Sequence, residues 1–377
     1  MLFKNGDIFI DGAFARGGFR VDNGRFSEVF LGDTDEPGVE LGGKCVIPGL
    51  IDIHTHGNSN EDFSDGSYDG LVKLAEYLAL NGITSFAPAS MTLPYERLEV
   101  AYRNAARLHR ERPAGCARLE GINMEGPFFS EKKKGAQNAK YLMPPDIGAF
   151  MRLNEAAEGL IRIVDIAPEL PGAAEFTKKA REFCTVSIAH TNAGYDEAAS
   201  VFEAGAQHLT HLYNAMPPFH HREHGPIGAA RERESVTAEL ICDGLHSPPS
   251  AVRAAFRLFP GRICLISDSL RCCGMPDGKY ELGGLDVFFG GGVARLADGT
   301  IAGSARNLYQ CLRNAVAFGI PKEQAILSAT RIPAGRIGRN GELGEINRGA
   351  HADFIICDGE LNRLVVYIGG ERVSAAS

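Results

Sequence analysis

The sequence predicts an α/β protein: a (β/α)8 barrel of the TIM type, joined to a small β-sandwich domain that is built from both chain ends. Three observations predict this fold class. Apolar runs alternate with helical stretches through the middle of the chain, the two ends share a different pattern, and polar residues follow the apolar runs. We expect the β-domain to comprise residues 1–49 and 341–377, and the barrel residues 50–340.

Both ends of the chain have the pattern of half-buried antiparallel strands. Residues 2–47 contain alternating runs that Gly and Asp separate, such as Asp7-Ile-Phe-Ile, and residues 341–374 contain similar runs, such as Asp353-Phe-Ile-Ile-Cys. Neither end has enough apolar residues to form a core alone. We therefore expect the ends to pair into one domain.

The middle of the chain repeats a strand–helix unit, which is typical of a parallel sheet. Eight short apolar runs predict buried strands, and this number favours a closed barrel over an open sheet. The predicted strands are residues 50–54, 83–87, 118–124, 161–166, 185–189, 207–210, 236–241 and 263–267. Helical stretches between them include residues 68–80, 95–110, 173–183 and 248–259.

Composition excludes several classes of protein. With 39 Lys+Arg against 47 Asp+Glu, the formal net charge is −8 and there is no basic tail, which argues against nucleic-acid binding. No apolar run approaches the ~20 residues that cross a bilayer. Asp7 and Asp11 interrupt the first apolar stretch, so we expect no signal peptide. Nine cysteines, an odd number, predict free thiols and a cytoplasmic protein.

Histidines and carboxylates recur where the predicted strands end. In a parallel barrel these ends surround one mouth, and His54 and His56 point the same way in extended chain because they are two residues apart. A divalent cation would neutralise carboxylates that are costly to bury alone. Imidazole and carboxylate without thiolate suit Zn²⁺ or Fe²⁺. The candidate ligands are His54, His56, Glu125, His190, His211 and Asp268.

Asp268 has a second predicted role. A carboxylate beside a metal-bound water can accept the proton that the cation makes acidic, and can then pass it to a leaving group. Asp268 is therefore the candidate catalytic base and acid, and a role as ligand alone or as both remains open.

The chain resembles the amidohydrolase superfamily, and within it the deacetylases of amino-sugar phosphates, over nearly its whole length. The resemblance rests on seven segments: Pro48-Gly-Leu-Ile-Asp-Ile-His-Thr-His-Gly, Glu125-Gly-Pro-Phe, Lys134-Gly-Ala-Gln, Ala189-His-Thr-Asn-Ala, Thr210-His-Leu-Tyr-Asn-Ala-Met, Asp243-Gly-Leu-His and Ser267-Asp. The segment that begins at Thr210 and the glutamate at the third strand are the most specific of these.

The resemblance implies hydrolysis of the acetamide of N-acetylglucosamine 6-phosphate to glucosamine 6-phosphate and acetate, by a metal-bound hydroxide. It implies that Glu125, His190 and His211 hold the metal that all members share. Some members carry Gln and Asn where this chain has His54 and His56, so the two histidines favour a second metal bridged by Glu125. One or two ions of Zn or Fe per subunit are therefore expected.

The resemblance also implies a phosphate site and a homodimer. Asn214, Ala215 and Arg222 match positions that contact phosphate, and the histidine matching His246 can reach it from a neighbouring subunit. Gln137 occupies a place where some members have a histidine that polarises the carbonyl. A glutamine donates a hydrogen bond but no proton, so a two-metal site is expected to take over that task.

Two further positions had more than one interpretation. Arg306 either changes which N-acyl sugar fits or points to solvent. Cys272 and Cys273 either make activity sensitive to oxidation or are inert packing. Two other classes of function compete with the deacetylase: an amidohydrolase that acts on another N-acyl sugar or amino acid, and a non-enzymatic relative that uses the barrel for binding.

Overall fold

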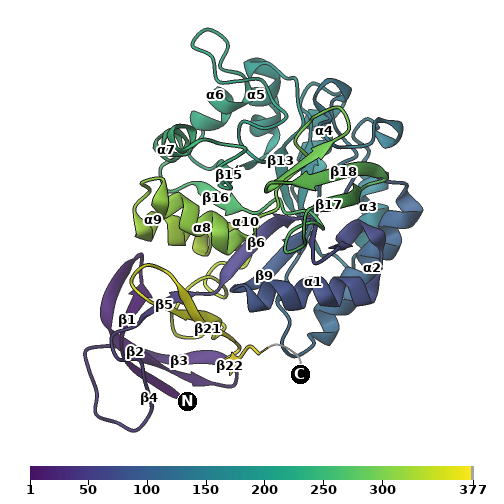
Figure 1. Ribbon diagram of the computed structural model, residues 1–377. Helices are drawn as coiled ribbons and strands as arrows, with labels where there is room; N and C mark the ends of the chain where they lie inside the picture. Colours follow the sequence, from purple (N-terminus) through teal and green to yellow (C-terminus); the bar gives the residue numbers. More distant parts are fainter. Residues whose placement is uncertain (375–377) are drawn as a thin grey trace.

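Strands from the two ends of the chain pair in one eight-stranded sheet in the computed structural model, which describes residues 1–374 (Figure 1). The order is β22-β21-β20-β5-β1-β2-β3, and β4 pairs with β1. The strands are β1 (Leu2–Ile10), β2 (Ala13–Asp22), β3 (Arg25–Leu31), β4 (Val39–Glu40), β5 (Cys45–Pro48), β20 (Phe354–Cys357), β21 (Arg363–Ile368) and β22 (Glu371–Arg372).

Aromatic side chains from both chain ends form the core of this sheet. Phe19 of β2 lies with its ring centroid 5.1 Å from Phe3 of β1 and 4.9 Å from Phe354 of β20. All three rings are fully buried. Aromatic pairs at such distances stabilise a core beyond the burial of their area, so the last strands contribute directly to the packing of the first.

The larger part of the molecule is an α/β fold whose curled sheets contain only parallel pairs. One sheet has the order β10-β9-β6 and the other the order β11-β12-β13-β14-β15-β16. The strands are β6 (Leu50–Thr55), β9 (Ile83–Pro88), β10 (Arg118–Leu119), β11 (Ile122–Met124), β12 (Ile161–Ile166), β13 (Thr185–Ile188), β14 (His208–Leu209), β15 (Thr237–Ile241) and β16 (Ile263–Ile266).

Helices follow the parallel strands along the chain and cover them (Figure 1). In α1, the side chain of Ser67 accepts a bond from the N–H of Gly70 at the first turn, and Leu71, Leu74 and Leu78 form the buried stripe. The helices are α1 (Tyr68–Leu80), α2 (Tyr95–Glu111), α3 (Ile147–Ala156), α4 (Ala173–Ala180), α5 (Tyr195–Ala204), α6 (Gly225–Arg231), α7 (Pro249–Leu258), α8 (Leu308–Ala317), α9 (Lys322–Ser328) and α10 (Arg331–Arg336).

The third predicted strand, residues 118–124, is in fact two. Its first half pairs with β9 and its second half with β12, so this segment lies between the two parallel sheets. Gly121 stands at the break, where a Cβ would lie 2.3 Å from Cγ of Arg162. The predicted helix 173–183 is shorter, because α4 ends at Ala180 and Phe183 donates to the carbonyl three residues back instead of four.

Three antiparallel strands follow β16 and were not predicted: β17 (Gly278–Leu282), β18 (Leu285–Gly290) and β19 (Val293–Leu296). Two Gly-Gly pairs, at 283–284 and 291–292, make the connecting turns with positive φ. Such pairs are a hairpin signal that the sequence does contain. A two-stranded ribbon of β7 (Gly57–Asn58) and β8 (Glu61–Asp62) completes the strands of the described residues.

Among residues 1–374, the helices include none with the length and apolar character that a membrane crossing requires.

Candidate metal centre

The structure brings all six predicted ligands together at the carboxyl ends of the parallel strands. His54 lies in β6, and the others lie just beyond the ends of β6, β11, β13, β14 and β16. Each residue is at most 7% exposed. The six residues are His54, His56, Glu125, His190, His211 and Asp268.

The first group of donors comprises Glu125, His190 and His211. Their ligand atoms lie within 4.8 Å of one another. Oε1 of Glu125 is 3.1 Å from Nε2 of His190 and 3.4 Å from Nε2 of His211. One carboxylate oxygen and two imidazole nitrogens thus face a common point, which is the donor set of a zinc or iron site.

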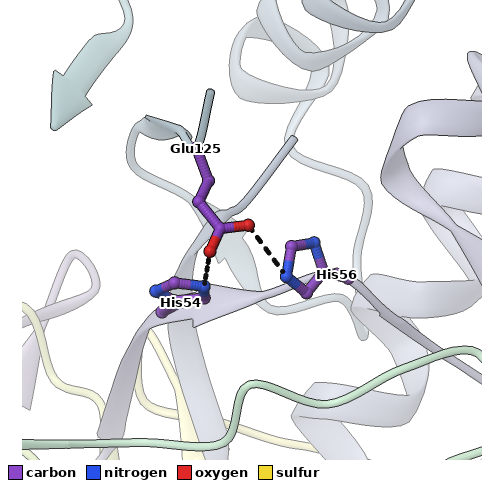
Figure 2. Close-up of side chains that lie close together, drawn as sticks. All are labelled: His54, His56 and Glu125. Carbon is purple, nitrogen blue, oxygen red and sulfur yellow. Dashed lines mark ion pairs between the residues drawn. The ribbon is translucent and has the colours of Figure 1, made fainter. Parts of the chain in front are cut away.

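The second group comprises His54, His56 and Glu125, whose ligand atoms also lie within 4.8 Å of one another. Figure 2 shows both rings facing the same carboxylate: Nε2 of His54 is 3.5 Å from Oε1, and Nε2 of His56 is 3.3 Å from Oε2. Oδ1 of Asp268 lies 3.3 Å from Nε2 of His56. Glu125 is therefore shared between the two groups.

The hydrogen bonds of the rings test whether these residues fit a cation. Nδ1 of His56, His190 and His211 each lies 2.9–3.2 Å from a backbone carbonyl oxygen, of Ala89, Lys133 and Asn214 respectively. A carbonyl only accepts, so these Nδ1 atoms donate and a neutral ring keeps a lone pair on Nε2. Lone pairs and a carboxylate that converge in a buried site fit a divalent cation.

The electrostatics of the site agree with this fit. Burial opposes charge on His54, but the carboxylates of Glu239 and Glu125 raise its pKa well above the ordinary value. Burial likewise opposes ionisation of Glu125, but the neighbouring imidazoles of His54, His190 and His211 hold its pKa well below the usual range. The cluster therefore stabilises positive charge, and a metal ion would compete with protons for its donor atoms.

Backbone strain is concentrated at the same residues. His190 (φ 42°), His211 (φ 29°) and Asp268 (φ 48°) lie in the left-handed region, which non-glycine residues seldom adopt. Such conformations cost on the order of 1–3 kcal/mol each and cluster at functional sites. Here the strain places three side chains just past the ends of β13, β14 and β16.

A neighbouring glycine makes room for Asp268. Gly303 has φ 65°, and a Cβ there would lie 2.9 Å from the carbonyl oxygen of Asp268. Any larger residue would force the strand end or the 300–303 segment to move. This close approach brings the segment after β19 to the rim of the site.

A cavity of about 380 Å³ opens above the candidate ligands. His56, Glu125, His190, His211 and Asp268 line its floor, and His54 lies beneath. Its walls include four of the five predicted substrate-binding residues, namely Gln137, Asn214, Ala215 and His246. A volume of this size suits a small molecule.

Gln137 contacts a candidate ligand directly. Its Nε2 donates to Oε2 of Glu125 at 2.7 Å, and its Oε1 accepts from the backbone N–H of Thr92 at 2.8 Å. The amide is therefore fixed in orientation at both ends. In this chain Gln137 holds the carboxylate that the two donor groups share.

Arg222 is the one predicted substrate-binding residue outside the cavity. It is exposed in the segment before α6 and does not line the cavity of its own chain. His246 does line that cavity, and its Nδ1 lies 2.8 Å from Oδ2 of Asp243. Within its own chain His246 thus lies in the cavity wall, and its contact with a phosphate in a neighbouring subunit stays a prediction.

The two ambiguous positions take their simpler interpretation. Arg306 is exposed and does not line the candidate cavity. Cys272 and Cys273 are buried, and burial raises their thiol pKa to about 12 and about 11. Their burial and raised pKa favour inert packing over sensitivity to oxidation.

Sequence reasoning missed four residues at or beneath the site. Lys132 and Lys133 line the cavity from the segment after β11. Glu239 and His208 are fully buried below the ligands, where Glu239 contacts His54 at 2.9 Å. The signal was a charged residue inside the apolar run 236–241, since a buried carboxylate requires a partner.

Parallel strands that carry a buried cluster of histidines and a shared carboxylate at their carboxyl ends define an α/β protein with a candidate metal centre. The model of the Amidohydrolase family matches residues 45–373, and the chain belongs to this family. The resemblance inferred from the sequence motifs is confirmed.

Within this family, the chain is similar to deacetylases of amino-sugar phosphates. The chain is 34% identical to the N-acetylglucosamine-6-phosphate deacetylase of Bacillus subtilis over 98% of this chain and 96% of that protein. It is 33% identical to the N-acetylgalactosamine-6-phosphate deacetylase of Escherichia coli O157:H7, over 89% of each. A Mycobacterium smegmatis N-acetyl-D-glucosamine-6-phosphate deacetylase, solved as a mutant with N-acetyl-D-glucosamine-6-phosphate, superimposes with a TM-score of 0.93 at 32% identity, over 99% of both chains.

Proposed function

We propose that this enzyme hydrolyses the acetamide of N-acetylglucosamine 6-phosphate to glucosamine 6-phosphate and acetate. The observation that carries the proposal is the convergence of Glu125, His190 and His211 on one point at the floor of a small-molecule cavity. The near full-length similarity to deacetylases of this substrate supports the choice of reaction. The galactosamine epimer is the second candidate substrate, because one relative carries that name.

The proposed cofactor is Zn²⁺ or Fe²⁺. Glu125, His190 and His211 would hold one ion, and His54 and His56 with Glu125 and Asp268 would hold a second. When bound, such an ion makes water acidic and polarises the carbonyl of the acetamide. The proposal rests on donor types and distances, which suit these metals over softer or harder ones.

Asp268 is the proposed base and acid. Burial opposes its ionisation, but the contact with His56 and the charge of His54 lower its pKa below the usual range, so the carboxylate is available to accept a proton. It lines the cavity floor. There it would take a proton from the attacking water and return it to the nitrogen of the departing amine, which completes the cleavage of the C–N bond.

The phosphate of the substrate is proposed to bind at the cavity wall formed by Asn214, Ala215 and His246. Lys132 and Lys133 line the same cavity and add positive charge. Arg222, which is exposed, would reach a phosphate from a second copy of the chain in a homodimer. Its position outside its own cavity supports this arrangement.

The finer fold assignments are also proposed. The two parallel sheets would close into one (β/α)8 barrel within residues 50–340, since Ala89 bridges to Asn123 and the N–H of Asp268 donates to the carbonyl of His54. Residues 1–49 and 341–374 would form the β-sandwich domain, and residues 375–377 of the expected range lie outside the described residues. Nine free cysteines within the described chain support a cytoplasmic location.

An acetate-release assay tests the function. We expect release from N-acetylglucosamine 6-phosphate, little from the unphosphorylated sugar or an N-acetyl amino acid, loss of activity on chelation, and return with Zn²⁺ or Fe²⁺. The galactosamine epimer, assayed in parallel, distinguishes the two candidate substrates. Faster turnover of unphosphorylated amides, or activity that survives complete metal removal, would contradict the proposal.

A further inference from the structure

Glu239 of β15 is a buried carboxylate that the proposed reaction does not use. Its Oε2 lies 2.9 Å from Nδ1 of His54 and accepts the backbone N–H of His211 at 3.1 Å. Its Oε1 lies 3.1 Å from Nε2 of His208. The side chain is fully buried, and its carboxylate contacts His54 of β6, His208 of β14 and His211, two residues beyond the end of β14.

This contact distinguishes His54 from the other candidate ligands. The Nδ1 atoms of His56, His190 and His211 donate to neutral carbonyl groups, whereas that of His54 faces a carboxylate. A carboxylate behind a ligating imidazole fixes the tautomer and the ring orientation, and makes the opposite nitrogen a stronger ligand.

The opposite nitrogen of His54 faces the cluster. Its Nε2 lies 3.5 Å from Oε1 of Glu125 and 3.8 Å from Oδ1 of Asp268. It has no hydrogen-bond partner among residues 1–374 and is fully buried. A buried nitrogen aimed between two carboxylates is in position to ligate a cation.

Glu239 is itself fixed in place. His208 donates to it from Nε2, and Nδ1 of His208 lies 2.6 Å from Oγ1 of Thr237 on the same strand as Glu239. The N–H of His211 supplies a third contact. The carboxylate therefore has little freedom to turn away from His54.

We propose that Glu239 is a positioning residue that prepares a second cation position, formed by His54, His56 and Glu125, separate from the position at His190 and His211. This inference rests on the proposed function, since it concerns the same metal centre. Glu239 would strengthen binding of the second ion through His54, without contacting either ion.

Zinc stoichiometry tests the inference in the full-length protein. After loading with Zn²⁺ and dialysis, elemental analysis is expected to give two equivalents for the wild type and one for Glu239→Gln. Competition with a chromophoric chelator should show that Glu239→Gln reduces the affinity of the second position for Zn²⁺ by about 10- to 100-fold, which is the usual effect of removing a carboxylate behind a ligating histidine. The other site should keep its affinity.

Asp165→Asn is the matched control. Asp165 on β12 is also fully buried, but its hydrogen bond comes from Oγ1 of Thr210, and none of the four histidines contacts it. This variant should bind two equivalents. In the zinc-loaded proteins, ¹⁵N-histidine NMR should show His54 with its proton on Nδ1 and its Nε2 ligated in the wild type and in Asp165→Asn, and should lack this signature in Glu239→Gln.

The outcomes separate this inference from the proposed function. A wild type that binds no Zn²⁺ would refute the proposed metal centre itself. A wild type that binds one ion, or a Glu239→Gln variant that binds two with unchanged affinity, would overturn the role of Glu239 and leave the deacetylase proposal intact. If Glu239→Gln does not fold by circular dichroism, Glu239→Asp gives the same test, since it keeps the charge but withdraws it from His54.

Discussion

The Nε2 atoms of His190 and His211 lie 3.1 Å apart, although the residues come from different strand ends. Each ring donates from Nδ1 to a backbone carbonyl, so in the neutral rings two lone pairs meet beside Oε1 of Glu125. Without a cation this arrangement is repulsive. A bound cation would relieve this repulsion, so metal binding is expected to stabilise the folded chain.

Metal removal is expected to lower the melting temperature and abolish acetate release. An ion present at 100 times its dissociation constant stabilises the fold by about 2.7 kcal/mol, if the unfolded chain does not bind it. Differential scanning fluorimetry with and without chelator measures the change. His190→Asn, which removes one donor, should show a smaller response, and equal melting of loaded and chelated wild type would count against a metal centre.

Asp268→Asn is expected to lower kcat by ~10² or more, because the amide cannot accept the proton from water. The protein should remain folded, as judged by circular dichroism. Steady-state kinetics at saturating substrate, with metal content measured on the same sample, checks this. Turnover close to that of the wild type would exclude Asp268 as the base.

Gln137→Leu is expected to reduce metal affinity or kcat by about 10- to 100-fold, because Glu125 loses the donor that orients it and the N–H of Thr92 loses its acceptor. Gln137→His, which keeps a donor at this position, should be affected less. Zinc titration and kinetics on both variants provide the comparison, and equal behaviour of the two would refute the orienting role.

Arg222→Ala and His246→Ala are both expected to raise KM for the phosphorylated substrate far more than for N-acetylglucosamine. If Arg222 acts across a homodimer, mixing the two impaired variants should restore activity at low concentrations of the phosphorylated substrate. The mixed dimer then contains one cavity with its own His246 and the partner's intact arginine. The assay is acetate release after subunit exchange, and a mixture as impaired as its components would refute action across the dimer.

The lowered pKa of His351 is expected to make the free energy of unfolding depend on pH. Arg118 of β10 donates to its Nδ1 at 2.9 Å, and burial together with Arg118 and Arg25 lowers its pKa to about 3. An unfolded histidine titrates near a pH of about 6.5. Below that pH the unfolded chain binds a proton that the folded chain does not, so stability falls as pH decreases.

The test of this pH dependence compares the wild type with His351→Gln. The melting temperature of the wild type minus that of the variant should decrease between about pH 7.5 and about pH 5, where unpaired carboxylates change little. A difference that stays constant with pH would show that the pKa of His351 is the same in the folded and unfolded protein.

The candidate ligands could be predicted because each follows an apolar run, and parallel strands end at a common edge. Glu239 could be noticed as a charge inside an apolar run, but its contact with His54 could not be predicted, since both faces of a buried parallel strand are apolar and the run gives no alternation to orient the side chain. Gln137 lies in an irregular segment without periodicity, so its contact with Glu125 depends on a loop path that the sequence pattern does not encode.

Placement on the surface was equally difficult to predict. The motif around Arg222 suggested a phosphate contact, but motif position alone does not reveal which chain's cavity an exposed loop can reach. The strands β17–β19 are joined by clear Gly-Gly turns. They form an antiparallel insertion, which the strand–helix repeat of a parallel barrel does not predict. Strand bounds within the repeat agreed closely, as for residues 161–166.

The pairing of β5 with both β1 and β20 has a consequence for biosynthesis. A ribosome makes β1 to β5 first, then the entire α/β part, and only then β20. Until Phe354 emerges, β5 has an unpaired edge, and Phe3 and Phe19 lack the ring of Phe354 that packs against both. The sheet made first is thus completed last, and a nascent chain with this open edge depends on protection from aggregation throughout its synthesis.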